Sequence, residues 1–223
     1  PVSNANPDLQ WERQAELNVG LDFSFMNYRL NGSIDFFNRT TSDLLAEVAV
    51  PVPPNLFPTT WVNLGEMQNT GLEIALNYNA IKKQNFTYNV SLTPTFYLSN
   101  KLVSLSKGDF SFGKELFLAN VGSPGLNSSP MVLVREGGNI GNFFGPVYEG
   151  VNDDGTWLFA DLDGDGKRGE LIEDERVLGN GLPKMELGWS NSFTVGKFDL
   201  SVFFRGVFGH DLVNNYRIFY ETL

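Results

Sequence analysis

The chain has 223 residues, no cysteine, a single histidine and a formal net charge of −10 at pH 7. This balance opposes binding to nucleic acid, whose phosphates require a basic surface, and the lack of cysteine excludes disulfide bonds and thiolate chemistry. No run of about 18 apolar residues is present, so the sequence predicts no membrane-spanning helix. The first residues lack the basic start and apolar core of a signal peptide, and we therefore expect a mature chain or a part of a longer one.

Residues 16–38 alternate between apolar and polar side chains over two segments of about ten residues each. A tilted strand needs about 9–11 residues to cross the hydrocarbon layer of a membrane, whereas soluble strands average about 5–6. This stretch therefore predicts two strands in the wall of an outer-membrane β-barrel, joined by a turn as short as Met26-Asn27. The positions expected to face lipid are Leu17, Val19, Leu21, Phe23, Phe25, Tyr28, Leu30, Ile34 and Phe36.

Two further hairpins have the same pattern. Residues 72–79 and 86–96 alternate and are joined by 80–85, while 185–195 and 198–205 are joined by Gly196-Lys197. Pro94 interrupts the second hairpin and predicts a bulge, or a strand end above the membrane. The segments between hairpins, 39–68 and 99–183, are long, and we expect them to be external loops and not wall. Tight turns within hairpins and long loops between them are typical of outer-membrane barrels.

Aromatic residues gather at both ends of the expected strands, with aliphatic residues between them, as the two interfaces of a membrane favour. Phe23, Tyr78 and Phe193 lie near the tight turns, whereas Phe36, Phe96 and Trp189 lie toward the opposite ends. The predicted fold class is therefore all-β, an antiparallel transmembrane β-barrel wall of about six strands with long external loops. Since a membrane barrel needs at least about eight strands, residues 1–223 would form only part of one barrel. A soluble β-sandwich, whose strands also alternate, remains the alternative.

The acidic residues are concentrated in one predicted loop. Between Glu149 and Arg176 there are ten Asp/Glu residues and three Lys/Arg residues. Within this segment, Asp161, Asp163 and Asp165 occupy positions one, three and five of an EF-hand-type calcium loop, with glycine at position six.

The end of this motif is irregular. The backbone carbonyl of Lys167 would be the next ligand, but position twelve is Ile172 where a bidentate acid is required. Asp174 or Glu175 would then have to close the site. We predict a calcium site formed by Asp161, Asp163, Asp165, Lys167 and Glu175, which would stiffen the loop and not catalyse a reaction. A solvated acidic turn without an ion is the alternative.

No catalytic motif is recognisable in the sequence, and we expect no enzyme activity. His210 has no accompanying nucleophile motif, and the glycine-rich residues 137–150 lack the Gly-Lys-Ser/Thr of a phosphate-binding loop. Phe143, Phe144 and Tyr148 in that segment suit stacking on a sugar ring or a partner, and equally suit packing within the loop.

Several motifs resemble, in their order along the chain, the late barrel region of SusC/RagA-type TonB-dependent outer-membrane transporters. The motifs are Asn6-Pro7-Asp8-Leu9-Gln10-Trp11-Glu12, Gly32-Ser33-Ile34-Asp35-Phe36-Phe37-Asn38, Thr41-Ser42-Asp43-Leu44-Leu45, Asn69-Thr70-Gly71-Leu72-Glu73, residues 161–166, Gly179-Asn180 and Pro183-Lys184. The chain departs from the family pattern after Gly166, where extra residues precede Arg176.

The resemblance implies a barrel of about 22 strands in the outer membrane of Bacteroidetes-type bacteria, with a plug and a TonB box that are not matched here. It also implies a SusD/RagB-like lipoprotein that lids the barrel, and a TonB complex that acts through the plug of the parent chain. Outer-membrane lipid would surround the wall, and a polar nutrient such as an oligosaccharide or a peptide would be imported. Two other functions stay open: a soluble, calcium-stabilised β-sandwich that binds carbohydrate or a surface partner, and an outer-membrane assembly or secretion component.

Overall fold

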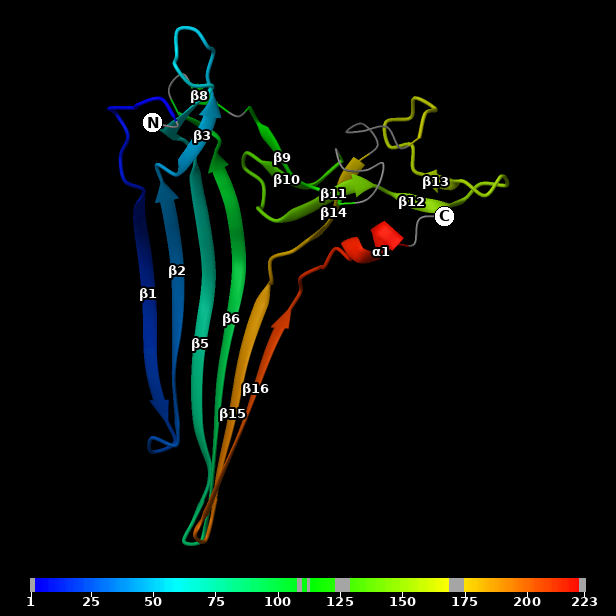
Figure 1. The fold of residues 1–223 in the computed structure, drawn as a ribbon. Helices are drawn as coiled ribbons and strands as arrows, with labels where there is room; N and C mark the ends of the chain where they lie inside the picture. The colour runs from blue at the N-terminus through cyan, green and yellow to red at the C-terminus, as the bar shows by residue number, and fades with distance from the viewer. Residues whose placement is uncertain (1–2, 108–109, 112, 123–128, 169–174, 221–223) are drawn as a thin grey trace.

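The computed structural model describes residues 3–107, 110–111, 113–122, 129–168 and 175–220. Its main body is a six-stranded antiparallel sheet in the order β1-β2-β5-β6-β15-β16. The strands are β1 (Arg13–Phe25), β2 (Leu30–Ser42), β5 (Glu66–Lys83), β6 (Phe86–Ser104), β15 (Met185–Val195) and β16 (Phe198–Phe208). In Figure 1 they form one curved wall, with the three tight turns at its lower end and the long connections at its upper end. The predicted wall of three consecutive hairpins is confirmed.

The strands extend further at their upper ends than the sequence predicted. β2 continues to Ser42 and β5 starts at Glu66, so both ends of the expected 39–68 connection belong to the wall. β6 likewise continues to Ser104, inside the expected 99–183 loop. The extension of β2, residues 39–42, is polar on both faces, since a strand that projects above a membrane meets water on both sides, whereas the extension of β6 includes the buried Leu102. None of these extensions alternates regularly between apolar and polar residues, so the sequence pattern did not predict them as strand.

Two of the three turns differ in length from the prediction. The β1–β2 turn is longer, because three consecutive residues adopt positive φ angles of 56°, 54° and 63°: Met26, Asn27 and Tyr28. Tyr28 therefore lies in the turn and not in the strand. The β5–β6 turn is shorter, because a bulge after Asn79 keeps the chain in β5 as far as Lys83. The turn at Gly196-Lys197 is as expected, with Gly196 at φ 63°.

Pro94 neither ends β6 nor forms a bulge, so that prediction is wrong. The strand passes through Pro94, which lies opposite Leu187 of β15. On the other side, the pairing of β6 with β5 is interrupted between the pairs Glu73–Thr95 and Leu76–Leu92. Both strands advance equally across this gap, so no residue is inserted. Proline lacks an amide hydrogen, which explains a gap in the ladder without a change of register.

The long connections form small sheets of their own above the wall. The first contains the hairpin of β3 (Leu45–Ala49) and β4 (Thr59–Asn63). The second contains a four-stranded sheet in the order β14-β11-β10-β9, which extends sideways from the upper end of the wall in Figure 1. Its strands are β9 (Glu115–Asn120), β10 (Pro130–Arg135), β11 (Asn142–Pro146) and β14 (Glu175–Asn180).

Shorter elements complete the second connection and the end of the chain. The pair β7 (Ser106–Lys107) and β8 (Phe110–Ser111) precedes the four-stranded sheet, and the hairpin of β12 (Tyr148–Val151) and β13 (Trp157–Phe159) lies beyond it. One short helix, α1 (Asn215–Tyr220), follows the last wall strand. Within the described ranges, no helix has the length and apolar character that crossing a membrane requires.

The buried apolar residues lie mainly in the loops and not on the apolar face of the wall. Val48, Val62 and Leu64 form a small core in the β3–β4 hairpin. By contrast, Leu21 on the apolar face is 65% exposed and Ile34 is 39% exposed. Among the described residues no second sheet covers this face, although a β-sandwich requires one. The described residues therefore do not form the alternative fold, a soluble β-sandwich.

Candidate functional site

One face of the wall is apolar across all six strands, because the strand registers align the predicted apolar positions in rows. Leu21 lies opposite Ile34, which lies opposite Ile74 on β5. Aromatic pairs occur along this face: the Tyr88 and Phe193 rings stack with centroids 4.5 Å apart, and Trp189 and Phe204 lie 5.1 Å apart. Strands of this length, with exposed apolar side chains on one face, form the lipid-facing surface of a membrane barrel.

Asn191 is a polar exception on the apolar face. Its position lies between Val90 of β6 and Val202 of β16, and its side chain is only 5% exposed. The Tyr88 hydroxyl donates a hydrogen bond of 2.8 Å to Asn191 Oδ1. Since lipid supplies no water to replace a missing partner, this bond satisfies the amide carbonyl within the hydrocarbon region.

Replacing Tyr88 with phenylalanine should lower the free energy of unfolding of the intact barrel by about 1–3 kcal/mol, because Asn191 Oδ1 loses its donor. Denaturant titration of the barrel in lipid vesicles measures this loss. The double variant Y88F/N191V should recover most of it, since neither polar partner then remains. Additive losses in the double variant would contradict the coupling.

The opposite face of the wall carries polar and charged side chains that pair across strands. Arg39 of β2 donates to Glu16 of β1 at 2.8 Å. Glu186 of β15 accepts hydrogen bonds from Arg205 at 3.0 Å and from the Tyr97 hydroxyl at 3.3 Å. Exposed pairs of this kind contribute little to stability, but they fix the positions of charges along the face. Such a surface suits water and polar solutes.

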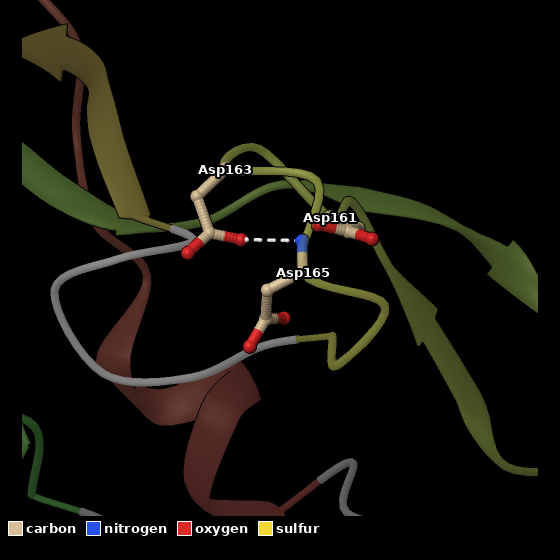
Figure 2. A group of neighbouring side chains, drawn as sticks. All are labelled: Asp161, Asp163 and Asp165. Atoms are coloured by element: carbon tan, nitrogen blue, oxygen red, sulfur yellow. Dashed lines mark hydrogen bonds between the residues drawn. The ribbon is translucent and has the colours of Figure 1, made fainter.

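The three aspartates predicted as calcium ligands converge in an exposed loop after β13. One carboxylate oxygen from each of Asp161, Asp163 and Asp165 lies within 4.8 Å of the other two, and Figure 2 shows the three side chains around one turn. The carboxylates also accept backbone hydrogen bonds within the loop, including 2.7 Å from Gly164 N to Asp161 and 3.0 Å from Asp165 N to Asp163. Gly164 and Gly166 have φ angles of +81° and +88°, a backbone conformation that favours glycine at both positions.

The other predicted ligands are the Lys167 carbonyl, which stays a prediction, and Glu175. Lys167 follows in the loop, and its Nζ lies 3.0 Å from Asp165 Oδ2. Glu175 is the first residue of β14 and does not belong to the converging carboxylates among the described residues. Asp174, the other candidate for closing the site, lies outside the described residues. The arrangement supplies three oxygen ligands for a hard cation such as calcium, with the last carboxylate unassigned.

Two acids of the neighbouring β12–β13 hairpin make structural contacts. Arg168 Nη1 bonds to Glu149 Oε2 at 3.0 Å and to Phe159 O at 2.9 Å, which ties the aspartate loop to the β12–β13 hairpin. Asp154 Oδ1 accepts hydrogen bonds from the Thr156 hydroxyl at 2.6 Å and from Thr156 N at 3.0 Å. These bonds to Thr156 lower the pKa of Asp154 below its usual value, because they favour the ionised carboxylate.

Asn180, which we did not predict as a functional residue, holds the loop sheet against the end of the wall. Its Oδ1 accepts from Leu182 N at 2.7 Å, its Nδ2 donates to Ile140 O at 2.9 Å, and its backbone N–H donates to Asp211 Oδ2 at 2.9 Å. A Cβ on the preceding Gly179 would lie 2.5 Å from Asp211 Oδ2, so a larger residue there would displace the carboxylate that accepts from Asn180 N. In the sequence, the Gly179-Asn180 motif was the feature that could have indicated these contacts.

The same junction fixes where the long connection leaves and rejoins the wall. Tyr97 N of β6 donates to Lys184 O at 2.9 Å, and Ile140 N donates to Asn100 O at 3.0 Å. A cavity of about 560 Å³ lies between these segments, lined by β6, residues 139–142 and residues 177–184. We refer to Asn180, Asp211 and these backbone bonds as the junction clamp.

The geometry defines a class of protein: a two-faced antiparallel wall, with tight turns at one end and folded loops at the other, is part of a membrane β-barrel. Residues 1–205 match the model of the family described as TonB dependent receptor-like, beta-barrel. The chain belongs to this family and is an outer-membrane protein.

Relatives of known name give a finer assignment. The chain is 31% identical to TonB-dependent receptor P3 of Formosa agariphila, over 94% of this chain and 22% of the relative. It is 29% identical to TonB-dependent receptor SusC of Bacteroides thetaiotaomicron, over 98% of this chain and 21% of the relative. The RagAB peptide importer in the "closed-closed" state has the same fold, with a TM-score of 0.73 and 24% identity over 92% of this chain and 22% of that chain. The chain spans about a fifth of the length of these relatives, and the predicted resemblance to SusC/RagA-type proteins is confirmed.

Proposed function

We propose that this chain forms part of the wall of a transporter that imports a polar nutrient across the outer membrane, powered through TonB. The observation that carries the proposal is the two-faced wall: apolar rows on one side and paired charges such as Glu186 and Arg205 on the other. In a barrel, the second face lines a water-filled interior, where a polar solute passes without meeting lipid. The family membership and the similarity to SusC support this role.

The proposal includes a SusD/RagB-like lipoprotein that meets the external loops. The small sheets of the two long connections stand together at the mouth of the wall and offer an ordered surface for such a lid. The relative named SusC and the structural neighbour named RagAB support a partner of this kind. The substrate class proposed is an oligosaccharide or a peptide, since amide, hydroxyl and carboxylate groups line the polar face.

Uptake by cells that contain the intact transporter and its lipoprotein tests this function. Cells lacking their other importers are given labelled pools of oligosaccharides and of short peptides in parallel. We expect one pool to accumulate, and accumulation to stop when the proton gradient that energises TonB is collapsed. Uptake that persists without the gradient, or no uptake of either pool, would contradict the proposal.

We further propose that the aspartate loop binds calcium through Asp161, Asp163 and Asp165, with the Lys167 carbonyl and Glu175 completing the site. Hard cations such as calcium prefer six to eight oxygen ligands, and three carboxylate oxygens already lie within 4.8 Å of one another. A bound ion would offset the repulsion among these acids and stiffen the external loop. It would serve the structure of the loop and not a chemical step.

Calcium titration of the intact transporter by calorimetry should give a binding heat that Asp163→Ala abolishes, because the loop loses one of its three converging carboxylates. Asp154→Asn is the matched control: it removes one charge from the neighbouring β12–β13 turn, where the carboxylate bonds to Thr156 of the same turn. The control should bind calcium as the parent does. Equal heats for the parent and Asp163→Ala would contradict the proposed calcium site. If the site exists, removal of calcium by a chelator should increase protease cleavage within this loop.

A further inference from the structure

The end of the wall that carries the tight turns is basic. Four cations lie in or beside these turns: Arg29, Lys82, Lys83 and Lys197. The flanking residues 23–34, 74–90 and 187–198 contain no Asp or Glu, and the next acid, Asp199, accepts a hydrogen bond of 2.7 Å from the Thr194 hydroxyl. Lys82, Lys83 and Lys197 are exposed, and none of them forms an ion pair with any residue that the structure describes. The opposite end holds the acidic loop, so the wall is polarised in charge along its length.

Two of the basic turns, β5–β6 and β15–β16, lie together and reach the apolar face, while the β1–β2 turn with Arg29 lies above them in Figure 1. Gly196 N donates to Asn85 O at 2.9 Å, which joins the β15–β16 turn to the β5–β6 turn. Lys83 lies opposite Phe86, which in turn lies opposite Val195 on the apolar face. A lysine at this position can extend along apolar surface while its ammonium group stays at the polar boundary.

An apolar groove opens on the same face beside the β1–β2 turn, which contributes Met26 to its lining. Its volume is about 300 Å³, and no charged residue lines it. The lining residues are Met26, Leu30, Leu76, Tyr78, Val90 and Leu92. An apolar groove of this volume on a lipid-facing surface suits a segment of a hydrocarbon chain.

Arg29 connects the groove to the basic turns. Its guanidinium carbon lies 5.9 Å from the centroid of the Tyr78 ring, which lines the groove. Its Nη2 donates to Asn79 O at 3.0 Å and to Ala80 O at 2.7 Å, so the guanidinium is held in place although it is exposed. Within the described part of the chain Nη1 has no hydrogen-bond partner, and it is therefore available to an acceptor from outside.

We propose that this groove and the basic turns bind an anionic phospholipid of the periplasmic leaflet. One acyl chain lies in the groove, and the headgroup phosphate meets Arg29 and Lys83. A guanidinium is well matched to phosphate oxygens, and each basic residue near an anionic lipid surface adds to the attraction. The inference rests on the membrane placement used in the proposed function, with tight turns at the periplasmic side. It does not depend on the imported nutrient.

Native mass spectrometry of the intact transporter in detergent tests this inference with two probes, phosphatidylglycerol and phosphatidylethanolamine of identical acyl chains. We expect phosphatidylglycerol to bind more tightly, and R29Q/K83Q to weaken its binding about tenfold while binding of phosphatidylethanolamine changes little. The matched control is K101Q/K114Q, which removes two exposed cations at the opposite end of the chain. It should leave the binding of both lipids unchanged.

Equal phosphatidylglycerol binding by the parent and R29Q/K83Q would overturn the inference, and so would equal binding of the two lipids by the parent. If R29Q/K83Q folds poorly because Arg29 loses its bonds to the β5–β6 turn, K82Q/K83Q keeps those bonds and must itself weaken phosphatidylglycerol binding. The uptake assay separates the two proposals. A transporter that shows no uptake but prefers phosphatidylglycerol argues against the proposed import only. A transporter that takes up a nutrient but binds both lipids equally argues against the lipid site only.

Discussion

Replacing Ile34 with arginine is expected to lower the free energy of unfolding of the intact barrel in lipid vesicles by about 2–4 kcal/mol. Ile34 lies on the apolar face, between Leu21 of β1 and Ile74 of β5. The substitution would place a guanidinium in the hydrocarbon layer, where it loses its water without gaining a partner. Guanidinium titration of the reconstituted protein, followed by tryptophan fluorescence, measures the change.

Ser33→Arg is the matched control for this experiment. Ser33 is the preceding residue of the same strand, and it lies opposite Asp22 and Ala75 on the polar face. An arginine there meets water and nearby carboxylates, so we expect a change in unfolding free energy below about 0.5 kcal/mol. Equal losses for Ile34→Arg and Ser33→Arg would show that lipid does not cover one face alone, and the interpretation of the wall would fail.

Replacing Gly32 with alanine should destabilise the barrel by about 1–3 kcal/mol, although it adds only one methyl group. The new Cβ would overlap the carbonyl oxygen of Ala75 on the neighbouring strand, and it would lie 2.7 Å from Phe23 Cζ. The carbonyl belongs to the backbone of β5, so relief requires the β2–β5 pairing itself to move. The same vesicle titration gives the loss.

Gly20→Ala separates this backbone conflict from a general effect of adding a side chain. Gly20 lies in β1 on the polar face, and the atom nearest to a new Cβ would be Oδ1 of Asp35. That oxygen is the end of a half-buried side chain and can rotate away, so the expected loss is below about 1 kcal/mol. If Gly32→Ala were tolerated as well as Gly20→Ala, close approach of backbones at Gly32 would not limit stability.

The wall was predictable from the sequence because its physical cause is periodic. Lipid on one side and water on the other force alternate residues to differ, and the registers place Leu21, Ile34 and Ile74 in one row as expected. The prediction of the strand ends failed where lipid no longer covers one face of the wall. Ser42 and Glu66 lie in strands above the membrane, where both faces meet water and no alternation arises. Asn191 also gave no signal, because its compatibility with lipid depends on a hydroxyl from another strand.

The loops were less predictable, because their order depends on contacts between distant segments. The aspartate motif identified three side chains that converge, since its spacing is local. The junction clamp joins Asn180 to Ile140 and Asp211, which are far apart in sequence. The four-stranded sheet β14-β11-β10-β9 likewise pairs segments that show no regular alternation. Composition and spacing carry no information about such pairings.

The junction clamp has a consequence for how proteins of this construction can diversify. Since Tyr97 and Lys184 are hydrogen-bonded to each other, the intervening segment leaves the wall and returns to it at almost the same point. The length and fold of a segment whose ends are already joined have little influence on the strands that carry it. The segment between Tyr97 and Lys184 can therefore change in length and fold while the membrane-embedded strands stay the same.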